Sequence, residues 1–307
     1  MNVREWALPV YTILMQLATG ALFILWLARS FSLRDNLSSK IDKILRRPVM
    51  VIFFTVLVAI IGSHFHLSNP LQSFMAVANF KHSWLSREIV FTILMFFTCA
   101  ALVDQLGKYE GRHTRVITWL GRMTVFFGAA SIFCMSSIYR LPTQAPWDDW
   151  STVLLFFGSS LLLGVTTAAA LGVMDNIYGR GREAELADER MSILRSSFGW
   201  MSAVITATLI LVVVVNFVQI LAVGNGDQLA QTSMSLLLGL YQPLLIFRFV
   251  ILLVGVGMFI LATFWLVKQG KSIQELVTPV YLACLFVLVA EILGRFLFYA
   301  THVRMGI

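Results

Sequence analysis

The sequence predicts an all-α integral membrane protein in which eight transmembrane helices form a bundle. The first observation is composition: hydrophobic residues make up 58% of the chain and charged residues only 13%, against about 25% charged residues in a typical soluble domain. The second is a mean hydropathy of +0.82. The third is that apolar runs of about 20 residues, the length that crosses a bilayer, recur along the chain. A soluble domain could not bury that much apolar surface, so we expect a bilayer as the solvent.

Each apolar run is expected to be a helix, because backbone groups in hydrocarbon must hydrogen-bond within the segment. Runs such as VITATLILVVVVNFV lack the alternating polarity of membrane-barrel strands. In chain order, the predicted spans cover residues 8–28, 48–66, 86–106, 117–138, 151–172, 198–223, 243–268 and 276–299. We therefore predict a single eight-span membrane domain over residues 1–307.

Loop lysines and arginines orient the bundle, because cytoplasmic loops carry the excess of positive charge. They concentrate in the odd-numbered connections: Arg29, Arg34, Lys40, Lys43, Arg46, Arg47, Lys108, Arg112, Arg115, Arg180, Arg182, Arg190, Arg195, Lys268 and Lys271. The loops and tails of the other side hold only Arg4, Lys81, Arg140 and Arg304. We therefore expect both termini in the periplasm and the chain in the bacterial inner membrane. These basic loops account for the pI near 9.6, so no nucleic acid partner is expected.

A charged cytoplasmic loop is predicted over residues 173–197, between spans five and six. Within it, Glu185 and Glu189 precede Arg190 and Ser192 at spacings that suit a short amphipathic helix. Two interpretations remain open. The segment is either a solvated helix that bridges two spans or a docking surface for a partner.

Ionisable residues inside the spans are the candidates for function, because a charge at the centre of a span costs about 3 kcal/mol on insertion scales. Glu88 lies about one turn into span three, Arg248 lies in the first turns of span seven, and Glu291 and Arg295 lie in span eight. In the predicted topology, all of these positions fall toward the outer face. The same side holds four further polar residues: His64, His66, Tyr299 and His302. This convergence predicts one polar site beneath the outer headgroups.

In span eight, Glu291, Arg295, Tyr299 and His302 form one stripe along the helix. A glutamate four residues before an arginine is the favoured order for an ion pair. Two interpretations remain open here as well. Glu291 and Arg295 either pair and merely lock helices together, or they belong to a polar pocket in which Arg295 holds a carboxylate or an anionic headgroup.

Glu88 and His66 are the predicted proton-transfer residues. Glu88 has no opposite charge at helical spacing other than Arg87, which faces another side. A half-buried carboxylate of this kind suits acid–base chemistry, and a histidine titrates near pH 6.5. Together they could take protons from a hydroquinone while its electrons leave elsewhere. The alternative for His66 is a capping role at the outer end of span two.

Four stretches of the chain resemble the membrane anchor subunit of the dimethyl sulfoxide reductase family of molybdenum oxidoreductases. They are EWALPVYTILMQLATG, SHFHLSNPLQSF, WLSREI and EILGRFLFYATHVRMGI, of which the last is the most specific. The resemblance implies eight spans with both termini outside. It also implies that the protein oxidises menaquinol and passes electrons to an iron–sulfur subunit, from which a molybdopterin subunit reduces the terminal acceptor.

The same resemblance implies roles for individual residues. The family's quinol-site glutamate, in its Ser-x-Glu-Ile segment, falls on Glu88, and Ser86 is the serine of that segment. The family's His-Leu histidine falls on His66. The sequence departs from the family pattern after this histidine, where Ser68-Asn69-Pro70 replaces the frequent Gly-Ser-Pro and Gln72 replaces a basic residue. The predicted quinol-binding residues are His64, Ser86, Arg248, Glu291, Arg295, Tyr299 and His302.

The sequence has no motif for a haem, an iron–sulfur cluster or molybdenum, so these groups are expected in partner subunits. A bis-histidine haem needs histidines on facing spans, whereas those of this protein lie near span ends or in loops. The three cysteines lie inside apolar runs, so no metal site is predicted. A secondary transporter stays an alternative, because Asn216 and Gln219 lie inside span six. A structural tether without a quinol site is the other alternative.

Overall fold

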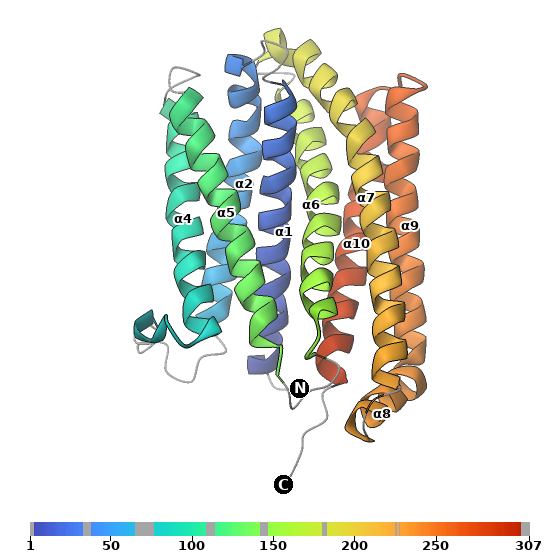
Figure 1. Cartoon of the computed structure of the whole chain (residues 1–307). Coiled ribbons are helices and arrows are strands. Elements are labelled where there is room, and N and C mark those ends of the chain that lie inside the picture. The colour runs from blue at the N-terminus through green and yellow to red at the C-terminus, as the bar shows by residue number, and fades with distance from the viewer. Residues whose placement is uncertain are drawn as a thin grey trace.

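The structure, a computed structural model, describes residues 3–32, 38–64, 77–108, 114–141, 147–179, 183–224, 226 and 228–301. In this part of the protein, eight helices are long and apolar enough to cross a membrane, which confirms the predicted number of spans (Figure 1). These helices are α1 (Val3–Ser32), α2 (Ser38–His64), α4 (Trp84–Lys108), α5 (Thr114–Ile138), α6 (Trp150–Gly179), α7 (Ala187–Gly224), α9 (Gln242–Val267) and α10 (Ile273–Ala300).

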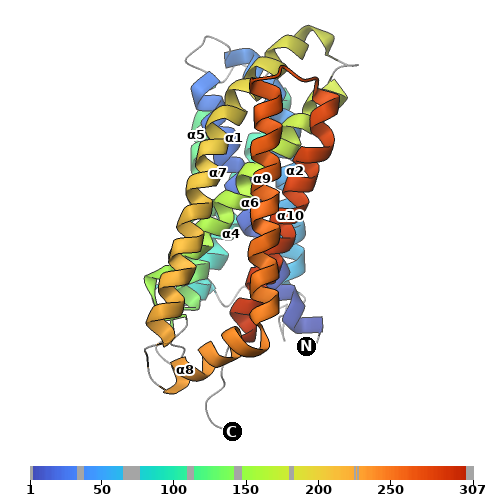
Figure 2. The same ribbon diagram turned by 90° about the vertical axis from the view of Figure 1, so that its right-hand side faces the viewer.

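The long helices run up and down, so that α1 begins and α10 ends at the same end of the bundle (Figures 1 and 2). We call this the terminal end and the other the opposite end. A short helix, α8 (Gln228–Ser235), continues into the π-helical turn η5 (Leu236–Leu240) and connects α7 to α9 at the terminal end (Figure 2). The sequence predicted no element there, because the segment is too short and too polar to register as a span.

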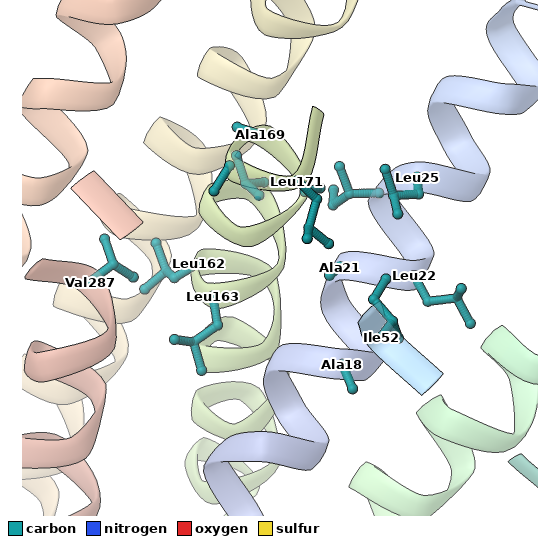
Figure 3. Close-up of a cluster of buried hydrophobic side chains, with 14 of the residues drawn as sticks. Ala18, Ala21, Leu22, Leu25, Ile52, Leu162, Leu163, Ala169, Leu171 and Val287 are labelled. Carbon is teal, nitrogen blue, oxygen red and sulfur yellow. The ribbon is translucent and has the colours of Figure 1, made fainter. Parts of the chain in front are cut away.

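Helices α1 and α6 form the centre of the bundle. In the most apolar stretches of α1 and α6, 72% and 78% of the residues are buried, against 17% in the corresponding stretch of α7. The two helices approach closely at Gly20 and Gly164, where a Cβ on Gly20 would lie 1.8 Å from the Ser160 carbonyl oxygen. Small residues at such a contact let helix backbones pack closely without large side chains between them. Around this contact, alanines and leucines of both helices meet Ile52 of α2 and Val287 of α10 (Figure 3).

Helices α6 and α7 run further than the predicted spans. Their ends at Gly179 and Ala187 lie inside the predicted loop 173–197, most of which is therefore helical, and the 3-10 turn η4 (Ala184–Leu186) lies between them. The sequence pattern ends each span at its first charged residues. In the structure these charges find partners across helices, so the helices continue. The role of this segment as a bridge or a docking surface stays a prediction.

The most deeply buried charges at the opposite end belong to two networks. In the first, Asp175 of α6 accepts bonds of 2.9 Å from both Arg47 of α2 and Arg190 of α7. Glu183 accepts a 3.2 Å bond from Arg47 and a second bond from Arg190. In the second network, Arg29 contacts both carboxylate oxygens of Asp42 at 2.6 and 3.1 Å. Buried charges of this kind are tolerated because each has ionic partners and hydrogen bonds.

Candidate functional site

Glu88 lies in the second turn of α4 at the terminal end, close to its predicted depth. Its side chain and that of Ser86 are buried, although helix α4 as a whole faces outward over much of its surface. The Glu88 carboxyl lies close enough to the Tyr11 hydroxyl of α1 to interact with it electrostatically. Its Oε1 atom has no hydrogen-bond partner among the described residues. Such an oxygen can accept a hydrogen bond from a ligand that donates one.

A row of hydroxyl groups runs beside Glu88. The Tyr11 hydroxyl lies 3.1 Å from Oγ1 of Thr92, which in turn lies 2.8 Å from Oγ of Ser131. These three residues belong to α1, α4 and α5 and are all buried. Hydroxyl groups both donate and accept, so the row is able to adjust to either protonation state of the carboxyl group. Sequence reasoning missed this row, because single hydroxyl residues in apolar helices are common and carry no spacing signal.

A second group of charges surrounds Glu291 of α10. Its Oε2 atom accepts a 2.5 Å hydrogen bond from Ser159 of α6, and its Oε1 atom lies 4.0 Å from Nη2 of Arg248 on α9. Arg248 also donates a 3.5 Å bond from Nη1 to Oδ1 of Asn216 on α7. The two charges therefore attract each other across helices α9 and α10 without a direct hydrogen bond.

Glu291 and Arg295 do not pair with each other, so the interpretation of an ion pair within span eight is wrong. Arg295 instead donates a 2.9 Å bond to Oε1 of Gln16 on α1, and its guanidinium lies 3.9 Å from the ring centre of Phe156. Gln16 in turn donates to the Phe156 carbonyl oxygen at 3.0 Å. The side chains diverge because neighbouring helices offer each one a closer partner. Gln16 was visible in the sequence as a glutamine within the first apolar run.

A tyrosine pair lies between the two charged groups. The hydroxyl oxygens of Tyr139, just beyond α5, and Tyr299 of α10 lie 2.5 Å apart. Both tyrosines are within electrostatic range of Arg295 and of Glu88. Tyr299 was predicted to belong to the site, whereas Tyr139 was not. The predicted single site is therefore two centres at the same end of the bundle, with a pair of phenols between them.

The centre around Arg248, Glu291 and Arg295 lines a cavity of about 90 Å³ between α6, α7, α9 and α10. Asn216 and Gln219, which the sequence left unexplained, line the same cavity. The glycine between Glu291 and Arg295 makes room for Arg248, since a Cβ on Gly294 would lie 2.5 Å from its Nε atom. The spacing Glu-x-x-Gly-Arg thus places one carboxylate, one guanidinium and a gap for a second guanidinium on one helix.

Of the three histidines predicted for the site, the structure describes only His64. His64 ends α2 at an exposed position, where its Nδ1 atom lies 2.8 Å from the Ile60 carbonyl oxygen, and it contacts neither charged centre. His66 and His302 lie outside the described residues. Among the described residues, no three of the His, Cys, Asp and Glu side chains form a group that could hold a metal ion.

Comparison with known proteins gives one consistent result. The sequence matches the family described as "DMSO reductase anchor subunit (DmsC)" over residues 1–301. It is 27% identical over 315 residues to the YnfH subunit of an anaerobic dimethyl sulfoxide reductase of Escherichia coli (strain K12), an alignment that covers 99% of this protein and 96% of the relative. The C subunit of anaerobic dimethyl sulfoxide reductase is 25% identical over 318 residues in Haemophilus influenzae, covering 100% and 98%, and 23% identical over 313 residues in Escherichia coli, covering 99% and 96%.

Proposed function

Because this protein belongs to the family of DMSO reductase anchor subunits, we propose that it oxidises menaquinol and passes the electrons to an iron–sulfur subunit. It is a multi-pass membrane protein and the membrane anchor subunit of a DMSO reductase complex, which also has catalytic and electron-transfer subunits. In the proposal, the protein lies in the bacterial inner membrane, and a molybdopterin subunit reduces the terminal acceptor with the electrons that the iron–sulfur subunit relays.

The observation that carries this proposal is the buried Glu88 carboxyl with its unpartnered Oε1 atom. Oxidation of a hydroquinone to a quinone releases two protons and two electrons. The electrons go to the partner subunit, and the protons need acceptors within hydrogen-bond reach of the quinol oxygens. Glu88 is one acceptor in this proposal, and the Tyr11–Thr92–Ser131 hydroxyl row holds the carboxyl group in place. His66 is the second proposed acceptor and lies outside the described residues.

The proposal gives the terminal end to the periplasmic side. The buried polar residues Glu88, Arg248 and Glu291 all lie within this half of the bundle, whereas most loop lysines and arginines belong to the opposite end. The iron–sulfur subunit is then expected at the terminal end, since electrons would otherwise have to cross most of the bilayer without a cofactor. Labelling of partner subunits in intact spheroplasts checks this side.

The experiment that tests the proposal is Glu88→Gln in the assembled complex. The substitution keeps size and burial but removes the proton acceptor, so menaquinol oxidation should fall by about 10²-fold or more. Asp104→Asn is the matched control, because it changes a half-exposed carboxylate at the other end of the same helix. Normal menaquinol turnover in Glu88→Gln, with the complex assembled, would favour a structural tether. Uptake of a solute by proteoliposomes of the isolated protein would favour a transporter.

A further inference from the structure

The cavity bordered by Arg248, Glu291 and Arg295 is called the Arg248 cavity here. Among the described residues, these three side chains do not satisfy all of their hydrogen-bonding groups. The three side chains are 8%, 2% and 6% exposed. In each of them one buried atom has no hydrogen-bond partner among the described residues: Nε of Arg248, Oε1 of Glu291 and Nε of Arg295. A buried donor or acceptor left unpaired lowers the stability of the folded protein. The three residues that carry these atoms all line the cavity, so its wall suits a ligand that both donates and accepts hydrogen bonds.

The charges of the Arg248 cavity select among such ligands. Its two guanidinium groups and one carboxylate leave a formal excess of one positive charge. This excess favours a ligand oxygen that carries partial or full negative charge, and the carboxylate favours a hydroxyl group that donates to it. A hydroquinone with one hydroxyl and one developing oxyanion satisfies both. The rings of Trp147, Phe156 and Phe298 also line the cavity and suit an aromatic ligand.

A groove between α6 and α7 adjoins this cavity. A groove of about 600 Å³ shares two lining residues with the cavity, Gln219 and Val223. Val214 and Val218 line the groove on α7 and are 50% and 55% exposed, so they face hydrocarbon. Two carboxylates, Asp148 and Asp149, also line it, at the start of α6. Between these carboxylates and the cavity, the groove is lined mainly by valines and other apolar residues, so it can hold an isoprenoid tail.

The volumes of the cavity and the groove suit a ligand whose polar end lies in the cavity and whose remainder lies in the groove. The cavity, about 90 Å³ in volume, corresponds to roughly three water molecules at about 30 Å³ each. That space suits the oxygen-bearing edge of a ring, and the groove takes the remainder of the ring and its tail. A lipid phosphate is a weaker match, because Arg248 lies in the second turn of α9 and Glu291 lies more than two turns before the end of α10, and because the Glu291 oxygen would then lack a donor.

We infer that the Arg248 cavity binds an isoprenoid quinone headgroup at a position distinct from the Glu88 carboxyl, reached laterally through the groove between α6 and α7. The identity of the ligand rests on the proposed function, whereas the position and the route do not. The paired Tyr139 and Tyr299 interact electrostatically with Arg295 of this cavity and also with Glu88. A carrier held there is poised to replace one that has been oxidised.

Photolabelling of the assembled complex tests the inference. The probe is a naphthoquinone with one isoprenoid tail and a photoreactive azide. Label is expected on peptides of α7 and α8 that border the cavity, including Met234, as well as on the peptide that contains Glu88. Val218→Trp should block the groove and reduce label at the α7 and α8 peptides by about tenfold, which corresponds to about 1.4 kcal/mol of binding free energy. Label near Glu88 should stay unchanged.

Val213→Trp is the matched control, because Val213 is a lipid-facing valine of the same helix that does not line the groove. It should leave both labels unchanged. Label confined to the Glu88 peptide, or equal loss of α7 label in both tryptophan variants, would overturn the inference and leave the proposed function intact. If excess naphthoquinone without the azide reduced the label on no peptide, both the inference and the proposed function would be overturned.

Discussion

At the opposite end of the bundle each of the most deeply buried charges has a directly hydrogen-bonded ionic partner, whereas at the terminal end, among the described residues, several buried charged side chains keep an atom without a hydrogen-bond partner. Arg29, Asp42, Asp175 and Arg190 are at most 2% exposed, and each has a partner within 2.9 Å. At the terminal end, by contrast, one side-chain atom each of Glu88, Glu291, Arg248 and Arg295 has no hydrogen-bond partner among the described residues. These charged side chains are similarly buried at the two ends, but they differ in whether their polar atoms have hydrogen-bond partners.

We propose that this difference separates charges that hold helices together from charges available for chemistry. A closed network such as Asp175 with Arg47 and Arg190 joins three helices and leaves no group for a ligand. An unpartnered buried atom lowers stability, and it is retained where a ligand or a proton completes it. In this proposal, the hydrogen bonding of buried charges indicates the functional end better than their number does, and substitutions can test it.

The largest expected effect on stability is that of Asp175→Asn at the opposite end. The change leaves the buried Arg190 with Glu183 alone and should lower the free energy of unfolding by about 3–5 kcal/mol. Menaquinol turnover per assembled complex should stay unchanged. Asp104→Asn, which removes a half-exposed pair with Lys108, is the control and should lose no more than about 1 kcal/mol. Equal losses in the two variants, measured by thermal unfolding in detergent, would contradict the distinction.

A smaller effect is expected from the arginines of the terminal end, with Arg248→Ala more harmful than Arg295→Ala. Arg248 is the cation nearest to Glu291, so its loss should lower the free energy of unfolding by about 3 kcal/mol. Arg295→Ala removes one charged hydrogen bond to Gln16, with an expected loss of about 1.5 kcal/mol. Thermal unfolding in detergent measures both losses.

The double variant Arg248→Ala/Glu291→Gln distinguishes the reasons for these losses. If Arg248 mainly neutralises Glu291, the double variant should be more stable than Arg248→Ala alone. Additive losses would mean that the 4.0 Å approach of the two groups contributes no energy.

The smallest effect is a pH dependence that originates at the opposite end. Partial burial alone would raise the pKa of Glu183, but the hydrogen bond from Arg190 and the charges of Arg47 and Lys43 outweigh it and lower the pKa below its ordinary value. The stabilisation is therefore complete above the unfolded glutamate pKa of about 4.3 and is lost as the pH falls through the lower folded value. Thermal unfolding between pH 7 and pH 3 measures it. Glu183→Gln should show a shallower decline, and an identical decline would refute this origin.

The sequence predicted the fold class and the family correctly, and each for a definable reason. Helix number follows from the lengths of apolar runs, which depend on local composition alone. The family resemblance rested on short segments such as the one from Glu291 to Tyr299, and the match over residues 1–301 confirms it. The depth of Glu88 was also predictable, because a helix of known start and rise fixes the height of each residue.

The partners of these residues were not predictable from spacing. Glu291 and Arg295 satisfy the helical rule for an ion pair, yet their nearest partners come from other helices: Ser159 and Arg248 for the first, Gln16 for the second. Spacing along one helix shows which side chains of that helix could meet. It does not predict which groups of the facing helices lie closer.

By itself, the sequence determined that eight apolar helices cross a membrane, and it predicted that the ionisable residues within the spans lie toward one end, because hydrophobicity and helical rise are properties of single segments. Only the tertiary structure decided that Tyr139 and Tyr299 pair with each other and interact electrostatically with both Glu88 and Arg295, and that the most deeply buried charges at the other end pair directly. Pairing depends on distances between atoms of different helices. The close contact of α1 with α6, at Gly20 and Gly164, and the packing of the other helices around them set those distances.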